Sequence, residues 1–262
     1  MSVERRSWGE ASYGTLHRQI ARRLGARIVS GEMEEGAALP NEAALSKELG
    51  VSRTVVREAV KVLAAKDLLE VRPKTGTKVR PRRDWNMLDP EILEWQFSGP
   101  GALAHIRDLL EVRLVVEPAA ARAAAERAEP GDLEEIERAC ADMEAASGDT
   151  ESSIEPDLKF HLSVLGSSHN VFMRPFGALI QAALRSSFRL TNEDRAAYLR
   201  SVRQHRDVLD AIRASDPDAA EAAMRLLLIS TLDDVNNALR TMGHRHSPGR
   251  RSKRPAPAKR KA

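Results

Sequence analysis

The chain has 262 residues, of which one is cysteine and 4% are aromatic. A single cysteine excludes an internal disulfide, and the scarcity of aromatic residues disfavours a β-sandwich. No apolar stretch approaches the roughly 20 residues that cross a bilayer, and the N-terminal residues lack the apolar core of a secretory signal. The sequence therefore predicts a soluble, cytoplasmic protein with no membrane partner.

The net charge of +3 hides a segregation of charge along the chain. Residues 1–83 carry 17 Lys and Arg against 10 Asp and Glu, residues 84–242 carry 16 against 28, and residues 243–262 carry 8 against none. A basic segment can neutralise phosphates, whereas an acidic one is not expected to lie on a polyanion. We therefore predict a nucleic-acid-binding domain at 1–83, a linker at 84–100, a second domain at 101–242 and a basic disordered tail at 243–262. An auxiliary DNA-binding arm is the alternative role of the tail.

Three helices are predicted in the basic domain. The first, Thr15–Gly31, has apolar residues at successive i+4 positions. The second, Asn41–Leu49, begins at a capping asparagine and ends at Gly50. The third, Ser52–Lys66, begins at a capping serine and has one apolar stripe. Two short helices joined by a tight turn that contains glycine, the second of them basic, form a helix-turn-helix.

Cationic side chains line one side of the third helix. Arg53, Arg57 and Lys61 are each four residues apart, so their charged ends share a face. Leu68–Arg72 and Thr77–Arg80 then form two predicted strands around a cationic turn. Such a β-hairpin is a wing that can lie along a DNA groove. A charged, solvated helix beside an unrelated hairpin is the alternative interpretation.

The linker is predicted to contain a short amphipathic helix, Glu91–Phe97, and Trp85, Trp95 and Phe97 are expected to dock the two domains together. Beyond the linker the apolar periodicity predicts helices and no strand. The predicted helices are Ala102–Ala128, Asp132–Ser147, Ser153–Ser168, Val171–Leu190, Arg195–Ala214 and Pro217–Met242. The predicted fold class is mostly α: an N-terminal winged helix-turn-helix of three helices and a hairpin, followed by an antiparallel all-α bundle.

One group of residues in the bundle suits metal or acid binding. Asp157 and His161 are four residues apart on one predicted helix, so their side chains share a face, and His205 lies on a later helix that can face them. A carboxylate and two imidazoles suit a divalent first-row metal such as Zn, Ni or Mn, or a polar pocket for an acidic ligand. Isolated histidines are also common as structural residues, so spacing alone leaves both interpretations open.

The basic domain contains three contiguous motifs, Leu39–Glu42, Leu49–Ala59 and Gly76–Val79. Together they resemble the winged-helix domain of the GntR family of bacterial regulators. That family often has a basic residue after the Pro-x-Glu of the second helix, whereas this chain has Ala43, so we expect its operator to be read differently. The DNA-binding residues that the resemblance implies are Ser52 and Thr54 on phosphates, Arg53 and Arg57 on base edges, and Lys74 and Gly76 at the wing tip in the minor groove.

The acidic domain contains Glu111–Arg113, Glu117–Pro118, Asp157–His161 and His169–Asn170, with His205 and Asp210–Ile212 further along. These motifs resemble the FCD-type effector domain of the FadR branch of the same family. The resemblance implies a metal held by Asp157, His161 and His205, together with one further histidine from the last helix. The corresponding stretch, Met224–Ile229, has no histidine. Three ligands with a water or an effector carboxylate could still hold a metal.

The effector-binding residues predicted in this domain are Arg113, Asp157, His161, Asn170, Arg185 and His205. Arg113 is the preferred candidate for binding a carboxylate, and Arg185 is the second candidate. An ion-paired structural role is the alternative for both arginines, and helix capping is the alternative for Asn170. Further resemblance at Trp85–Asp89 and Glu117–Arg122 to sugar-acid-responsive members of the family implies an effector such as D-galactonate.

The predicted function is a homodimeric transcriptional repressor of a sugar-acid catabolic operon, which binds double-stranded, palindromic operator DNA and is released by the sugar acid. A regulator that responds to another small carboxylic acid is the nearest alternative. A metal-dependent enzyme using Asp157, His161 and His205 is less favoured, because the sequence shows no partnered nucleophile and no phosphate-binding glycine loop. An architectural, non-specific DNA binder would leave the large acidic domain unexplained.

Overall fold

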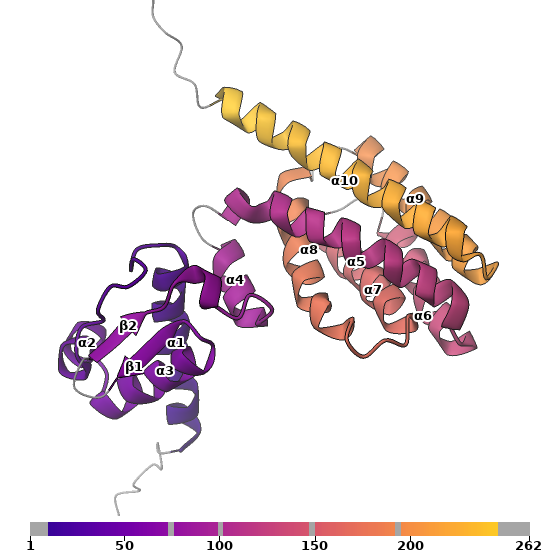
Figure 1. The fold of residues 1–262 in the computed structure, drawn as a ribbon. Coiled ribbons are helices and arrows are strands. Elements are labelled where there is room, and N and C mark those ends of the chain that lie inside the picture. The colour runs from indigo at the N-terminus through magenta and orange to yellow at the C-terminus, as the bar shows by residue number, and fades with distance from the viewer. Residues whose placement is uncertain (1–9, 73–75, 99–101, 147–149, 192–194, 246–262) are drawn as a thin grey trace, which may run out of the picture.

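The computed structural model describes residues 10–72, 76–98, 102–146, 150–191 and 195–245. The chain forms two bodies joined by a short helix (Figure 1). The N-terminal body holds α1 (Glu10–Val29), α2 (Glu42–Leu49), α3 (Arg53–Ala65), β1 (Leu69–Arg72) and β2 (Gly76–Val79). The joining helix is α4 (Pro90–Ser98). The second body holds α5 (Ile106–Arg127), α6 (Pro130–Ala145), α7 (Thr150–Ser167), α8 (Gly177–Thr191), α9 (Arg195–Arg213) and α10 (Pro217–Arg245). The predicted mostly α fold class is confirmed.

Capping residues set the ends of the short helices in the N-terminal body. The Asn41 side chain accepts a hydrogen bond from the Ala44 amide at 2.9 Å, and Gly50, with φ +68°, ends α2. The Ser52 hydroxyl accepts a hydrogen bond from the Val55 amide at 3.3 Å and caps α3. These caps are the ones that the sequence predicts, and they fix a tight turn between the two helices.

The strands β1 and β2 form an antiparallel hairpin that pairs Leu69 with Val79 and Arg72 with Gly76. Leu69 and Val79 are buried in the same apolar core as the inner faces of α1 and α3. Arg72 and Gly76, at the other end of the ladder, are exposed. One end of the hairpin is therefore anchored in the core while the other projects from it, as in a wing.

Helix α4 has apolar residues in both bodies. Ile92 and Trp95 are buried in the core of the N-terminal body, to which Trp85 also belongs. Leu93 and Phe97 are buried in a cluster with residues of α5 and α8. Because both sets of side chains lie on one short helix, α4 ties the two bodies together. Of the three aromatic residues predicted to dock the two domains, Phe97 packs on the second body, whereas Trp85 and Trp95 both pack in the core of the N-terminal body.

Gly25 of α1 lies against the ring of Trp95. A Cβ at position 25 would lie 2.3 Å from the ring atom Cζ3, which is far inside van der Waals contact. We expect Gly25→Ala to lower the free energy of unfolding by about 1–3 kcal/mol, because a well-packed site cannot take an extra methyl group without strain. The matched control is Gly166→Ala, since no atom lies within 4 Å of its Cβ. Urea denaturation tests both variants, and a Gly25→Ala protein as stable as wild type would contradict the packing of α1 on α4.

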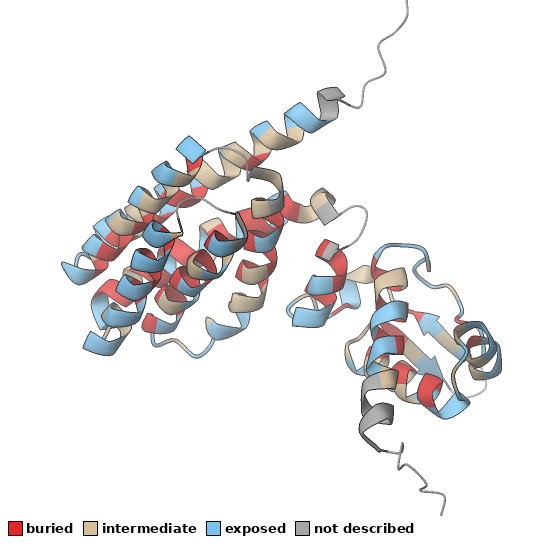
Figure 2. Cartoon of the chain, turned by 180° about the vertical axis from the view of Figure 1, so that it is seen from behind, coloured by how far each residue is buried: buried red, intermediate tan, exposed pale blue. Residues whose placement is uncertain are grey.

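The second body is an antiparallel helical bundle in which α5 and α10 lie side by side (Figure 1). Arg122, near the end of α5, forms an ion pair with Asp218 at the start of α10, and Ile106, at the start of α5, packs near Val235. Buried residues concentrate on the inner faces of the helices (Figure 2). No helix in the described ranges is long and apolar enough to span a membrane.

The predicted helix boundaries differ from the structure by more than four residues in two places. The first helix begins at Glu10 and not at Thr15; the prediction misses residues 10–14 because the apolar periodicity on which it depends starts only at Leu16. The predicted helix Val171–Leu190 is wrong at its start: α8 begins at Gly177, after a 3-10 turn at Arg174–Phe176. A proline at position 175 and a side-chain turn at position 170 both favour a break there. The other bundle helices begin and end within four residues of their predicted first and last residues.

Candidate functional site

The helix α3 buries one face and exposes the other. Its buried residues are Val55, Val56, Ala59 and Leu63. Its exposed polar residues include Arg53, Thr54, Arg57 and Lys61. The second helix of the helix-turn-helix therefore presents a cationic surface to solvent, as its sequence predicts. A surface of this kind, beside a projecting hairpin, suits the major groove of DNA.

The two predicted base-reading arginines differ in their partners. Arg57 donates from Nε and Nη2 to the two carboxylate oxygens of Glu42 at 2.9 and 2.7 Å. The hydrogen bond from Arg57 is the main reason that the pKa of Glu42 lies below its ordinary value. Arg53 has no hydrogen bond or ion pair with the residues that the structure describes. Arg53 is therefore the arginine whose donors are all available to DNA.

The remaining predicted DNA-binding residues surround this surface. Ser52 is exposed, and its hydroxyl can donate to a phosphate while it accepts the capping hydrogen bond of α3. Gly76, with φ +89°, opens β2 in a backbone conformation that favours glycine. Lys74 lies outside the described residues. The structure thus places Ser52, Arg53, Thr54 and Arg57 together at the start of α3.

Three predicted metal ligands meet in the interior of the bundle. Asp157 and His161 come from α7 and His205 comes from α9, and all three are buried. The Asp157 Oδ1 atom lies 3.0 Å from His205 Nε2 and 3.2 Å from His161 Nε2. The two Nε2 atoms lie 3.3 Å apart. Three ligand atoms from two helices therefore converge on one point.

The neighbours of the two imidazoles show how a cation would fit. His205 Nδ1 lies 2.7 Å from the Ser201 carbonyl oxygen, which only accepts, so this nitrogen carries the proton. Arg113 Nη2, which only donates, lies 3.1 Å from His161 Nε2. In the neutral form of both rings, His161 Nε2 accepts this hydrogen bond, whereas the lone pair of His205 Nε2 faces the Asp157 carboxylate. Lone pairs that face one another repel unless a proton or a metal ion lies among them, so the donor set fits a metal.

Arg113 and Glu117 of α5 complete this cluster. Arg113 Nε donates to Glu117 Oε1 at 2.5 Å, and Glu117 Oε2 lies 2.5 Å from His161 Nδ1. Both side chains are only 2% exposed. Arg113 Nη1 is buried and has no hydrogen-bond partner among the described residues. The residues predicted from the sequence do not include Glu117, although its i+4 spacing from Arg113 on one helix is a signal for it.

Opposite charges in the cluster outweigh the cost of burial. Burial raises the pKa of Glu117, but the charges of Arg113 and His161 have the larger, opposite effect and bring this pKa down to about 2. Burial also raises the pKa of Asp157, which its hydrogen bonds with the two histidines bring below its ordinary value. Burial lowers the pKa of His161, but Glu117 and Asp157 together outweigh burial and raise this pKa above its ordinary value. Both carboxylates are therefore charged at neutral pH, and a proton and a metal would compete for His161.

Two predicted effector-binding residues lie away from the cluster. Arg185 is exposed on α8, and its Nη2 lies 4.0 Å from the Glu155 carboxylate. Asn170 lies between α7 and α8, where its side-chain oxygen accepts a hydrogen bond from the Phe172 amide at 3.0 Å. This contact forms a local turn and does not cap a helix, because the 3-10 turn that follows begins only at Arg174. The structure brings together the other four predicted residues, Arg113, Asp157, His161 and His205.

Both halves of the chain match known families. Residues 16–79 match the bacterial regulatory proteins of the gntR family, and residues 108–251 match the FCD domain. The second match covers the bundle that contains the buried cluster. The first covers the helix-turn-helix and the hairpin.

The alignments with known regulators cover most of this chain and most of each regulator. The galactonate operon transcriptional repressor of Escherichia coli (strain K12) is 39% identical over 209 residues, which are 79% of this chain and 91% of the relative. The uncharacterized HTH-type transcriptional regulator YieP of the same strain is 35% identical over 222 residues, 84% of this chain and 95% of the relative. A solved structure of Lar, which controls the expression of the Listeria monocytogenes agr system, covers 85% of this chain and 97% of its own with a TM-score of 0.60. At 17% identity that likeness shows the fold alone.

The relatives are transcriptional regulators and not enzymes, and the residues of this chain fit that role. The N-terminal body presents an exposed basic helix, and the second body holds a buried polar cluster. The chain belongs to the GntR family of bacterial regulators with an FCD domain, and it is a DNA-binding transcriptional regulator that responds to a small-molecule effector.

Proposed function

We propose that this regulator is a homodimeric repressor of a sugar-acid catabolic operon, and that a sugar acid such as D-galactonate releases it from operator DNA. The observation that carries the proposal is the buried Arg113 guanidinium, whose Nη1 has no partner among the described residues, beside the Asp157–His161–His205 cluster. A buried cation next to several polar groups suits a hydroxylated carboxylate. The 39% identity to a galactonate operon repressor supports a sugar acid over other acids.

A divalent metal such as Zn, Ni or Mn is part of the proposal. Asp157, His161 and His205 would hold it, since their ligand atoms all lie within 4.8 Å of one another. When bound, the metal would supply positive charge for the oxygen atoms of the effector. Met224 and Leu228 of α10, in the stretch that lacks a histidine, are buried in the apolar core. Three protein ligands would therefore leave a coordination position for water or the effector.

In the proposed complex with operator DNA, the start of α3 enters the major groove and the hairpin lies along the neighbouring minor groove. Bases are then read by hydrogen bonds from arginine, and phosphates are held by hydroxyl groups. The proposed contacts are Arg53 and Arg57 with bases, Ser52 and Thr54 with phosphates, and Lys74 and Gly76 with the minor groove.

An exposed apolar patch on α5 and α10 supports a homodimer. Val115 is 75% exposed and Leu226 is 56% exposed, with Val112 and Ile229 also on the surface. Because α5 and α10 are antiparallel neighbours, the four side chains lie at about the same level of the bundle. Exposed apolar patches on soluble proteins indicate protein interfaces. Two copies joined here would present two recognition helices to the two halves of a palindrome.

Fluorescence anisotropy on the DNA upstream of its own gene tests the function. We expect D-galactonate to weaken operator binding by about 5- to 150-fold, the usual range of coupling between an effector and a second ligand. L-Lactate is the control acid, because it has a carboxylate but only one hydroxyl group.

The other possible results of this titration test DNA binding, the class of effector and the metal separately. Specific binding that no acid weakens would contradict the sugar-acid proposal and leave DNA binding intact. Release by L-lactate with equal potency would replace the sugar acid by the alternative class of small carboxylic acids. Loss of the D-galactonate response after treatment with a chelator, and its return with Zn, would support the metal.

A further inference from the structure

Glu42 is the first residue of α2, and its carboxylate holds the side chain of Arg57 in α3. Arg57 Nε donates to Glu42 Oε1 at 2.9 Å, and Arg57 Nη2 donates to Glu42 Oε2 at 2.7 Å. These two parallel hydrogen bonds occupy one edge of the planar guanidinium, the edge formed by Nε and Nη2. Because two contacts and not one hold this edge, the plane of the guanidinium is fixed relative to α2.

The outer edge of the same guanidinium keeps its donors. Arg57 Nη1 makes no hydrogen bond with the residues that the structure describes, and the Arg57 side chain is 56% exposed. Nη1 and the second N–H of Nη2 form a parallel pair of donors at the tip of the side chain. Such a pair matches O6 and N7, the two acceptors that guanine presents in the major groove. Arg57 can therefore make a bidentate contact with guanine while Glu42 holds its other edge.

The position of Glu42 is fixed by the helix-turn-helix itself. Asn41 caps α2 directly before Glu42, and Leu45, one turn later, is 1% exposed in the core. At the other end of α2, the Ser46 hydroxyl donates to the Val51 carbonyl oxygen at 2.5 Å across the turn that leads into α3. These contacts hold α2 and α3 in one arrangement. A carboxylate on such a rigid framework can orient a side chain of the neighbouring helix.

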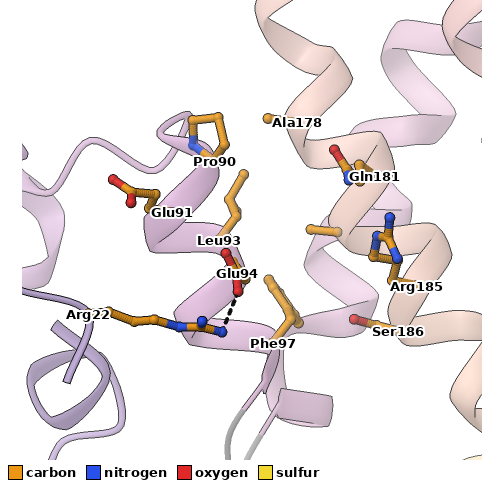
Figure 3. A pocket seen from close by; sticks show the side chains of 11 residues that line it. Arg22, Pro90, Glu91, Leu93, Glu94, Phe97, Ala178, Gln181, Arg185 and Ser186 are labelled. Carbon is orange, nitrogen blue, oxygen red and sulfur yellow. Dashed lines mark hydrogen bonds and ion pairs between the residues drawn. The ribbon is translucent and has the colours of Figure 1, made fainter. Parts of the chain in front are cut away.

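Two other ion pairs of the N-terminal body have the same chemistry but do not involve α3. Glu94 of α4 lies 2.7 Å from Arg22 of α1 (Figure 3), and Glu48 of α2 lies 2.8 Å from Arg27 of α1. In the described part of the chain, Glu42 is the one carboxylate that pairs with an arginine of α3. Exposed ion pairs contribute little to stability, and a carboxylate close to DNA repels phosphates. The benefit of Glu42 therefore lies in what it does to Arg57.

We propose that Glu42 is a positioning residue for sequence recognition: it holds Arg57 by the Nε–Nη2 edge so that the Nη1–Nη2 edge binds O6 and N7 of a guanine in each half of the operator. The proposal rests on the contact between Arg57 and a base proposed above, and it does not depend on the effector or the metal. Without Glu42 the guanidinium would be free to turn to phosphates, which carry no sequence information. The preference for one sequence would then fall.

Fluorescence anisotropy of the full-length protein tests the proposal on two DNAs, a duplex that wild type selects from a random pool and a scrambled duplex. The quantity of interest is the ratio of the two affinities. We expect Glu42→Ala to lower this ratio about tenfold, within the range of about 5- to 150-fold that a bidentate base contact supplies. Glu42→Gln keeps an oxygen that accepts one of the two hydrogen bonds, so it should retain part of the ratio.

The matched control is Glu48→Ala. Glu48 is an exposed carboxylate of the same helix, and its partner is Arg27 of α1. Both alanine variants remove one negative charge from α2 and should strengthen binding to the scrambled duplex by the same small factor. Glu48→Ala should leave the ratio of the two affinities as in wild type, because it leaves Arg57 in place.

Arg57→Ala separates positioning from a structural role of Glu42. If Glu42 acts through Arg57, then adding Glu42→Ala to Arg57→Ala should not lower the ratio further, whereas damage to α2 would lower it in both backgrounds. Single guanines of the selected duplex are also replaced with 7-deazaguanine, which lacks N7. At the guanine that Arg57 contacts, the replacement should weaken binding of wild type, weaken binding of Glu42→Ala less, and leave binding of Arg57→Ala unchanged.

The variants distinguish failure of this proposal from failure of the contact on which it rests. A wild-type ratio in Glu42→Ala, or a further loss in the double variant, would overturn the role of Glu42 and leave the base contact of Arg57 standing. A wild-type ratio in Arg57→Ala would contradict the base contact, and the proposal with it. If every 7-deazaguanine replacement weakens wild type and Arg57→Ala equally, Arg57 does not read the N7 of a guanine and the proposal is wrong.

Discussion

Replacing Arg113 with methionine is expected to abolish release from operator DNA by the effector and to lower the free energy of unfolding by about 3–5 kcal/mol. The guanidinium is buried, and it donates to the buried carboxylate of Glu117 at 2.5 Å. Methionine fills much of the same volume but leaves this carboxylate with too little positive charge around it. Release is lost because the variant has no cation for the effector carboxylate. Anisotropy measures the first effect and urea denaturation the second.

Two further variants separate binding from stability. Arg113→Met combined with Glu117→Gln removes both charges, so this double variant should recover part of the lost stability and still fail to respond to the effector. Arg122→Met changes an arginine of the same helix that is 42% exposed and paired with Asp218, so we expect a loss of less than about 1 kcal/mol and a normal response. A double variant that folds and is released normally would contradict the role of Arg113.

The sequence predicts the N-terminal body closely because its signals are local. Asn41 and Ser52 cap helices through hydrogen bonds that span three residues, and Gly50 ends α2 through its own backbone conformation. The buried stripe of α3 follows from periodicity within one helix. Such interactions depend little on the rest of the chain, so a pattern in the sequence carries over to the structure.

The buried cluster is predictable in part, because one of its contacts is local and the others are not. Asp157 and His161 share a face of α7 by their spacing, and α9 brings His205 to them. That Arg113 and Glu117 lie against His161 depends on how α5 packs on α7, which no periodicity encodes. For the same reason the sequence does not reveal that Arg185, a suitable cation for a carboxylate, lies on another face of the bundle.

Helix α4 shows a further limit of sequence patterns. Its alternating contacts, Ile92 and Trp95 on one side and Leu93 and Phe97 on the other, make a helix that is apolar around most of its circumference. A segment read as a linker is therefore packed into both bodies. Two separate cores share this helix, and the apolar pattern within α4 does not identify which other helices cover its apolar side chains.

Replacing Arg53 with alanine is expected to cost about 1–3 kcal/mol of binding free energy on operator DNA, or about 5- to 150-fold in affinity. Arg57 already donates two hydrogen bonds to Glu42, whereas Arg53 has no such partner in the described part of the chain. All donors of Arg53 can therefore turn to a base edge, where a bidentate contact discriminates one base from another. Arg23→Ala, at an exposed arginine of α1 outside the helix-turn-helix, is the control and should change affinity little.

The salt dependence of binding decides what Arg53 does on DNA. An arginine that reads a base contributes to the preference for the operator over unrelated DNA. Its loss should therefore reduce the ratio of the affinity for the operator to the affinity for unrelated DNA. An arginine that holds a phosphate strengthens binding to all sequences about equally, so its loss should weaken binding to operator and unrelated DNA alike and reduce the slope of log affinity against log salt by about one. Anisotropy titrations of wild type, Arg53→Ala and Arg23→Ala on operator and scrambled DNA at several salt concentrations distinguish the two. Equal weakening on both DNAs with a reduced slope would assign Arg53 to the DNA backbone and leave Arg57 as the base-reading arginine of α3.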